Sequence, residues 1–166
     1  MNWTWGDKSA EILGELHCDL QMILQWGLEY SPVDFGLNEG YRIPAKQFEY
    51  FKVGRKQAEN GSWYPKDPNK KGILTNCDGT HIKSNHNYKP CTAVDIYIFV
   101  VGKSKLTYDL AHISLVAGVL IATAHFLYEQ GKIQHKLRWG GNWDNDGEIL
   151  YDQDFDDTPH FELYKP

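Results

Sequence analysis

The most apolar stretch of the chain, from Ser114 to Leu127, limits the folds that the sequence can adopt. It spans about 14 residues and contains His125, whereas a membrane-spanning helix needs roughly 20 apolar residues. We therefore predict no membrane span but a buried core helix, which begins at Leu106 or Tyr108 and ends at Gln130. A buried helix needs other elements to cover it, so the chain is expected to fold around this segment.

The composition is typical of a folded globular protein. The 166 residues suffice for one domain with a core, and 42% of them are hydrophobic. The formal net charge is −5, and the sequence has no long basic run. Because phosphate neutralisation needs clustered Lys and Arg, we expect no nucleic acid as a partner. We predict a single domain over residues 1–166 and a monomer.

The N-terminus and the cysteines indicate a cytoplasmic product. Residues 1–7 have neither a basic start nor an apolar segment, so they do not resemble a secretion signal. The three cysteines, Cys18, Cys77 and Cys91, cannot all pair within one chain, and no Cys-x-x-Cys motif occurs. We therefore expect reduced thiols. A bridge between Cys77 and Cys91, or a metal role for them, stays open.

The remaining pattern predicts helices packed on a small sheet. The expected elements are helices at 10–30, 45–53 and 108–130 and strands at 33–37, 92–101 and 159–164. Ser9 is expected to cap the first helix, and Gly54 to end the second. Residues 57–79 are expected to form a long loop. This order predicts an α+β fold with a mainly antiparallel sheet.

Two stretches that lie far apart in the sequence hold residues that could bind one metal ion. Asp157 lies three residues before His160, although such a pair alone is common by chance. His86 precedes a turn with Pro90, and this turn can fold His86 back beside Asp95 in the strand that follows. Two imidazoles and one carboxylate suit Zn²⁺ and leave a fourth position for water.

Such a site would give two further residues a role in peptide hydrolysis. The metal would lower the pKa of the water toward about 7. Asp157 could then act as the general base and pass the proton to the leaving amine. Arg42 could bind a substrate carboxylate or an oxyanion, because its guanidinium group matches paired oxygens.

The order of these motifs resembles a known enzyme family. Ser-x-His at 84–86, Ala-Val-Asp at 93–95, Trp-Gly-Gly-x-Trp at 139–143 and Asp-x-x-His-Phe-Glu at 157–162 are similar to the zinc peptidases of peptidoglycan. These include the D-Ala-D-Ala carboxypeptidases and dipeptidases of vancomycin resistance. They also include the L-alanyl-D-glutamate endopeptidases that serve as phage endolysins.

The N-terminal half extends the resemblance over residues 9–164. Asn-Glu-Gly-Tyr-Arg at 38–42, followed by Gln47, is similar to the family stretch that lines the cleft. Leu-His-Cys-Asp at 16–19 is similar to a Leu-His-Pro-Asp segment, with Cys18 where Pro is common.

The resemblance implies a Hedgehog/DD-peptidase-like single domain and a set of site residues. These are the zinc ligands His86, Asp95 and His160, the catalytic carboxylate Asp157, the substrate contact Arg42, and the supporting residues Ser84 and Gln47. One interval departs from the family, since Asp95 lies nine positions after His86 where seven are usual. The longer turn reshapes one wall of the cleft and leaves the substrate preference open.

The activity that we expect is that of an L-alanyl-D-glutamate endopeptidase serving as a phage endolysin. It would be made in the host cytoplasm and would act on the cell wall after release at lysis. A D-Ala-D-Ala carboxypeptidase or dipeptidase with the same ligands is the first alternative. A non-enzymatic metal-binding module of the same fold is the second.

An acidic loop raises the question of a second metal. Asn142, Asp144, Asp146 and Glu148 place oxygen ligands at alternate positions, as in the first half of a calcium loop. The twelfth position is Gln153 instead of Glu. Ca²⁺ is therefore a second candidate cofactor, and a solvated acidic loop is the alternative.

Overall fold

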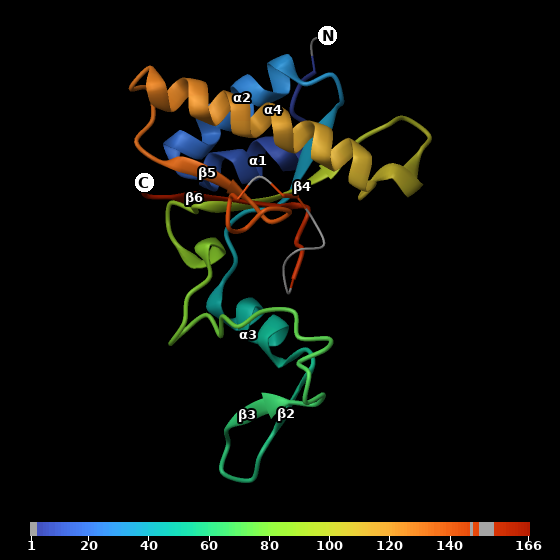
Figure 1. The fold of residues 1–166 in the computed structure, drawn as a ribbon, viewed down its shortest axis with the longest axis vertical. Helices are drawn as coiled ribbons and strands as arrows, with labels where there is room; N and C mark the ends of the chain where they lie inside the picture. The colour runs from blue at the N-terminus through green and yellow to red at the C-terminus, as the bar shows by residue number, and fades with distance from the viewer. Residues whose placement is uncertain (1–2, 147, 150–154) are drawn as a thin grey trace. The chain divides into compact units, whose positions relative to one another are not determined.

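The computed structural model describes residues 3–146, 148–149 and 155–166. The chain forms two compact units. The larger unit comprises residues 1–41 and 89–166, and the smaller unit comprises residues 42–88. The single domain over residues 1–166 stays a prediction. Helices and antiparallel strands together confirm the α+β class (Figure 1).

The larger unit is built on a four-stranded antiparallel sheet. Its strand order is β1 (Phe35–Glu39), β4 (Ala93–Ile98), β6 (His160–Tyr164) and β5 (Lys136–Trp139). Three helices lie on one face of this sheet, namely α1 (Asp7–Glu15), α2 (Cys18–Tyr30) and α4 (Leu110–Glu129) (Figure 1). A short 3₁₀ helix, η2 (Ser104–Leu106), precedes α4. Strand β5 was not predicted, because its four residues are too few to show alternation in the sequence.

Helix α4 is the core helix that the apolar stretch predicts. One face buries Ile113, Val116, Leu120 and Leu127. Among the described residues, α4 is the one helix that is long and apolar enough to cross a membrane. Its 20 residues lie within the predicted bounds and extend beyond the apolar stretch from Ser114 to Leu127, so length does not separate it from a membrane span. The evidence for a core helix is its burial against α2, where a Cβ on Gly27 would lie 2.3 Å from Leu120 Cδ2.

The first predicted helix is in fact two helices, and the prediction of one continuous helix is wrong. Leu16 leaves the helical conformation and forms a β-bridge with Cys91. The His17 backbone N–H donates to the Cys91 carbonyl at 2.7 Å, and the His17 side chain accepts from the Asp19 N–H at 3.2 Å. A long-range backbone pairing therefore interrupts a segment whose leucine spacing alone indicates one helix.

Ser9 does not cap the first helix as predicted. The N-cap is Gly6, and Ser9 lies inside α1. The buried Ser9 hydroxyl accepts a hydrogen bond at 3.0 Å from the backbone N–H of Leu37 in β1. Ser9 thus fastens the helix to the sheet.

The smaller unit contains helix α3 (Pro44–Lys52), a hairpin of β2 (Arg55–Gln57) and β3 (Trp63–Pro65), and the 3₁₀ helix η1 (Asn85–Asn87). The second predicted helix is confirmed to within one residue at each end. Gly54 follows it with φ +73°, as expected of a glycine that ends a helix. The predicted loop is only partly correct, because the hairpin extends into residues 57–79. Cys18, Cys77 and Cys91 are free cysteines in the structure, and their reduced state stays a prediction.

A turn at residues 78–82 organises the segment that leads to η1. The Asp78 carboxylate accepts from the backbone N–H groups of Ile82 at 3.0 Å, Thr80 at 2.8 Å and His81 at 2.7 Å. It also lies 2.8 Å from Nδ1 of His81. The hydrogen bond from Ile82, followed by those from Thr80 and His81, outweighs burial and holds the pKa of Asp78 well below its usual value.

Asp78→Ala is expected to destabilise this turn by about 1–2 kcal/mol at pH 7, as the loss of a helix cap does. Because the pKa of Asp78 is lower in the folded state, this stabilisation is present above about pH 4 and is lost as the pH falls through the folded-state value. Amide hydrogen exchange at residues 80–82 should show the two proteins converging in acid. Glu59→Ala, at an exposed carboxylate of the same unit, is the control. A difference that persists unchanged into acid would contradict the assignment.

Candidate active site

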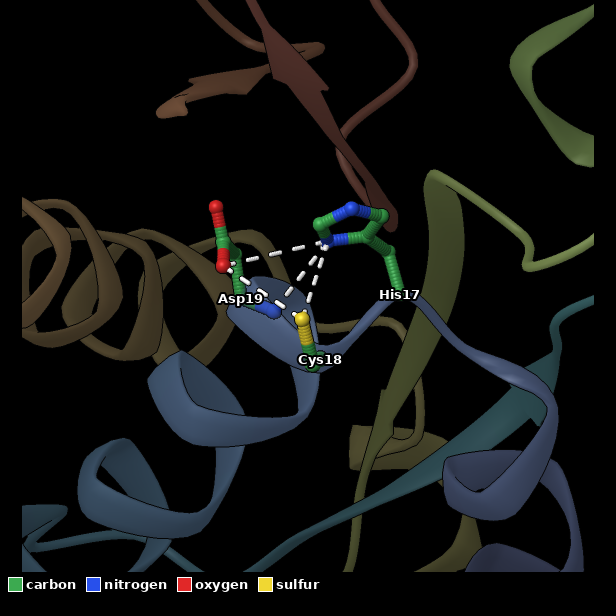
Figure 2. Close-up of side chains that lie close together, drawn as sticks. All are labelled: His17, Cys18 and Asp19. Atoms are coloured by element: carbon green, nitrogen blue, oxygen red, sulfur yellow. Dashed lines mark hydrogen bonds and ion pairs between the residues drawn. The ribbon is translucent and has the colours of Figure 1, made fainter. Parts of the chain in front are cut away.

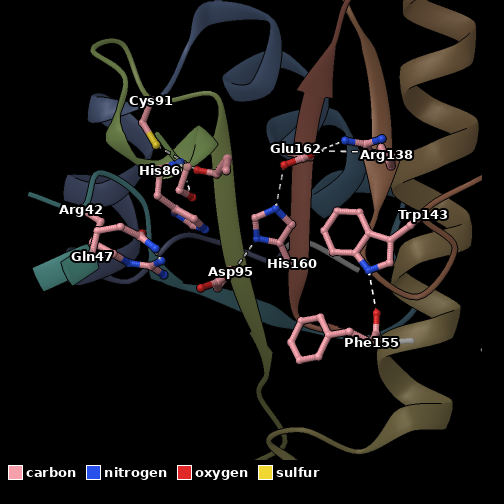
Figure 3. Close-up of polar contacts among 12 residues, drawn as sticks. Arg42, Gln47, His86, Cys91, Asp95, Arg138, Trp143, Phe155, His160 and Glu162 are labelled. Atoms are coloured by element: carbon pink, nitrogen blue, oxygen red, sulfur yellow. Dashed lines mark hydrogen bonds and ion pairs between the residues drawn. The ribbon is translucent and has the colours of Figure 1, made fainter. Parts of the chain in front are cut away.

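Asp95 and His160 lie side by side on neighbouring strands. Strand β4 pairs with β6 in a register that places Asp95 opposite His160. Residues directly opposite each other in an antiparallel pair share one face of the sheet. Nδ1 of His160 lies 3.1 Å from Oδ1 of Asp95 (Figure 3). The β-sheet register thus joins the two predicted ligands, which are 65 positions apart in the sequence.

Glu162 holds the other nitrogen of the same imidazole. It lies two residues further along β6, on the same face as His160. Nε2 of His160 lies 3.1 Å from Oε2 of Glu162 (Figure 3). Arg138 of β5, the register partner of Glu162, donates from Nε to Oε1 at 3.1 Å, and its Nη2 bonds to the same oxygen. Sequence reasoning missed Glu162, although its spacing from His160 is a detectable signal.

The imidazole of His160 is almost completely buried among carboxylates. Burial lowers the pKa of His160, but the hydrogen bonds to Asp95 and Glu162 outweigh it, assisted by the negative charges of Asp95 and Asp157. Together they raise the pKa to about 9. A metal ion bound by His160 would compete with a proton for the imidazole, because a metal-binding histidine is neutral.

The pair of Asp95 and His160 fits a metal ion. The distance of 3.1 Å between Oδ1 and Nδ1 is close to the roughly 3.4 Å that separates two ligands of a tetrahedral Zn²⁺. Glu162 on the opposite nitrogen matches the carboxylate that commonly orients a metal-binding histidine. This arrangement gives the imidazole a fixed tautomer and a fixed direction.

Backbone hydrogen bonds hold Asp157 just before β6. The Asp157 N–H donates to the Gly140 carbonyl at 2.8 Å, and the Gly140 N–H donates to the His160 carbonyl at 2.9 Å. The His160 N–H in turn donates to the Asp157 carbonyl at 2.9 Å. Backbone hydrogen bonds therefore connect the segment of Asp157 to that of Gly140. The negative charge of Asp157 is close enough to His160 to raise the pKa of the His160 imidazole.

Two tryptophans hold the segment around Asp157. The Trp139 indole N–H donates to the Thr158 carbonyl at 2.7 Å. The Trp143 indole N–H donates to the Phe155 carbonyl at 2.9 Å (Figure 3). The Trp143 ring also lies 5.4 Å from that of His160. These contacts give the two tryptophans of the Trp-Gly-Gly-x-Trp motif a scaffold role.

Gly140→Ala is expected to displace Asp157, because an added Cβ would lie 2.3 Å from the Asp157 carbonyl oxygen. We expect a loss of about 1–3 kcal/mol in unfolding free energy, accompanied by a fall in the peptidase activity that the sequence predicts. Gly118→Ala in α4 is the matched control, since its Cβ would meet nothing within 4 Å. Thermal unfolding and activity assays on both variants test the difference. Equal behaviour of the two variants would contradict this account of Gly140.

In the smaller unit, hydrogen bonds fix the side chains of Arg42 and Gln47. The Arg42 guanidinium donates from Nη1 to Gln47 Oε1 at 2.8 Å (Figure 3). It also lies over the Tyr50 ring, 4.6 Å from the ring centroid. Gln47 is fully buried and donates to the Cys77 carbonyl at 3.0 Å. The predicted support residue Gln47 therefore orients Arg42 from within its own unit.

Hydrogen bonds within the same unit also position His86. The Arg42 backbone N–H donates to the His86 carbonyl at 2.8 Å, and the Asn87 side chain donates to the Arg42 carbonyl at 2.7 Å. Ser84 caps η1, since its hydroxyl accepts from the His86 N–H at 3.3 Å. His86 is buried, with 2% of its surface exposed. Of the three predicted zinc ligands, two thus belong to the larger unit and His86 to the smaller one.

Comparison with known proteins decides the family. A profile of the phage L-alanyl-D-glutamate peptidase family matches residues 1–164. The chain belongs to this family. The predicted family and the predicted peptidase activity on peptidoglycan are thereby confirmed.

A solved structure supports the fold of this peptidase. The L-Ala D-Glu endopeptidase ChiX of Serratia marcescens is similar to it with a TM-score of 0.62 and 23% sequence identity. The match covers 95% of this chain and 87% of ChiX. A search of curated proteins gives no significant match. The predicted fold class is confirmed, and the roles of individual residues rest on their own geometry.

The acidic loop of the peptidase is described only in part. The Asn142 side chain accepts from the Asn145 N–H at 2.9 Å, and Asp146 accepts from the Glu148 N–H at 2.9 Å. Asp144, Asp146 and Glu148 are exposed. Gln153 and its acidic neighbours lie outside the described residues. The calcium site therefore stays a prediction.

Proposed function

We propose that this peptidase is zinc-dependent and cleaves the bond between L-alanine and D-glutamate in the peptidoglycan stem peptide. The proposed ligands are His86, Asp95 and His160, a donor set that could hold a metal ion. The observation that carries the proposal is the row of Asp95, His160 and Glu162 across β4 and β6. Two imidazoles and one carboxylate are a ligand set that Zn²⁺ favours in hydrolases.

Asp157, Glu162 and Arg42 have separate proposed roles in hydrolysis. A bound Zn²⁺ supplies Lewis acidity at the scissile carbonyl and lowers the pKa of water. Asp157 takes the proton of the attacking water and delivers it to the leaving amine of D-glutamate. Glu162 fixes the direction of the His160 ring. Arg42, aligned by Gln47, pairs with a substrate carboxylate.

The proposed cellular role is that of an endolysin. The protein would be made in the host cytoplasm and would reach the wall at lysis. Digestion of purified peptidoglycan, followed by mass spectrometry of the new termini, tests the bond that is cleaved. We expect new C-terminal L-alanine and N-terminal D-glutamate. Release of D-alanine as the sole product would instead identify a D-Ala-D-Ala carboxypeptidase.

Glu162→Gln is expected to weaken zinc binding by about 10–100-fold, as is usual when the carboxylate behind a metal-binding histidine is lost. The substitution keeps the size of the side chain but removes the charge that faces Nε2 of His160. Competition with a fluorescent zinc chelator measures the affinity. Glu129→Gln, at an exposed carboxylate at the end of α4, is the control. Unchanged affinity in Glu162→Gln would show that this contact does not orient a ligand.

A further inference from the structure

We propose that His17, Cys18 and Asp19 form a second metal site, which binds Zn²⁺ or a similar thiophilic divalent ion. The three residues are consecutive and lie at the start of α2 within the larger unit (Figure 2). They share no residue with the proposed catalytic set. The inference is independent of the proposed function.

The three ligand atoms already lie at distances that suit one ion. Cys18 Sγ is 3.8 Å from His17 Nδ1 and 3.6 Å from Asp19 Oδ1 (Figure 2). His17 Nδ1 is 3.9 Å from Asp19 Oδ1. A tetrahedral Zn²⁺ separates a nitrogen or oxygen ligand from a sulfur ligand by roughly 3.6 Å. The group therefore needs only small movements to close around an ion.

The break between α1 and α2 creates this arrangement. His17 has φ −59° and ψ 141°, which is outside the helical region, whereas Cys18 and Asp19 are in the first turn of α2. This bend turns the His17 ring back over the helix start, where Nδ1 accepts from the Asp19 N–H at 3.2 Å. The Leu16 bridge and the His17 N–H bond to Cys91 fix the bend.

Gln134 and His135 hold the Asp19 carboxylate in place through its second oxygen, Oδ2. Its Oδ2 accepts from the backbone N–H groups of Gln134 at 2.9 Å and His135 at 3.1 Å, and it lies 2.8 Å from His135 Nδ1. Oδ1 thus faces His17 and Cys18. This is the arrangement of a metal-binding carboxylate whose second oxygen is fixed by neighbouring donors.

The donor chemistry selects the class of metal. One thiolate and one imidazole favour Zn²⁺ and related transition metals over Mg²⁺ and Ca²⁺, which prefer oxygen ligands. On binding, the Cys18 thiol releases its proton to solvent and a bond forms between sulfur and the metal. His17 Nδ1 exchanges the Asp19 N–H for the ion. Because Cys18 is exposed, a water molecule can occupy the fourth position.

Metal analysis of variants tests the proposal. After dialysis against Zn²⁺, we expect about two zinc ions per chain in the parent, and about one each in Cys18→Ser and His160→Ala. Cobalt-loaded parent and His160→Ala should show thiolate-to-cobalt absorption that Cys18→Ser lacks. Cys77→Ser is the matched control and should retain both properties. Equal zinc content in the parent and Cys18→Ser, without thiolate absorption, would overturn the site.

A measurement on the unaltered protein removes any dependence on the folding of variants. Zn²⁺ should slow alkylation of Cys18 by roughly tenfold or more, because a metal-bound thiolate is a poorer nucleophile. Peptide mass spectrometry assigns the modified cysteine, and Cys77 provides the internal reference. Alkylation of Cys18 at the same rate with and without Zn²⁺ would also overturn the proposal. Peptidoglycan cleavage is expected to persist in Cys18→Ser, which separates this site from the proposed catalytic one.

Discussion

Asp157→Asn is expected to lower kcat by about 10²–10⁴-fold, the usual contribution of a general base. The amide has the shape of the carboxylate but cannot take the proton of the attacking water. The backbone hydrogen bonds of Asp157 to Gly140 and His160 do not involve the side chain, so the turn should persist. Zinc affinity is therefore expected to remain close to that of the parent.

The neighbouring Asp156→Asn is the matched control for that experiment. It removes one negative charge from the same segment and is expected to retain most of the activity. Single-turnover kinetics on a soluble stem peptide, with zinc content measured in parallel, separate chemistry from metal binding. Full activity in Asp157→Asn, or equal losses in the two variants, would remove Asp157 from the mechanism.

His160→Ala is expected to lower kcat/KM by roughly 10³-fold or more, because a metal ligand carries several kcal/mol of transition-state stabilisation. The substitution also leaves Asp95 and Glu162 as two carboxylates without the imidazole that lies between them. We expect the loss of tightly bound zinc from the catalytic set. Chelator competition measures the affinity directly.

His112→Ala is the control for the loss of an imidazole, because His112 contacts Asp109 at the start of α4 and has no proposed role in the site. Its zinc affinity and activity should match those of the parent. Near-parental activity in His160→Ala, with normal folding by circular dichroism, would contradict its assignment as a ligand.

The order of motifs in the sequence singled out Asp95 and His160, two predicted ligands that the sheet brings together. Asp95 was expected in an apolar strand and His160 at the start of another, and the register of β4 with β6 brings them together. Glu162 is part of the Asp-x-x-His-Phe-Glu motif, but its role was not predicted, because that role depends on contacts with His160 and Arg138. Only the pairing of three strands reveals that row of side chains.

Two of the misread elements, the divided first helix and strand β5, share one physical cause, namely long-range backbone pairing. The leucine spacing of residues 10–30 indicates one helix, but the bridge from Leu16 to Cys91 divides it. Strand β5 is recognisable only through its pairing with β6. Local propensity does not report such pairings, so the segments that depend on them were predicted least well.

Removal and return of the metal tests the central claim most directly. The protein is stripped by chelation, supplied with Zn²⁺ or Ca²⁺, and assayed by mass spectrometry for cleavage between L-alanine and D-glutamate. We predict no cleavage by the stripped protein, restoration by Zn²⁺ but not by Ca²⁺ alone, and no restoration in His86→Ala. Cleavage that persists without metal, or that Zn²⁺ restores equally in His86→Ala, would contradict the proposed zinc site.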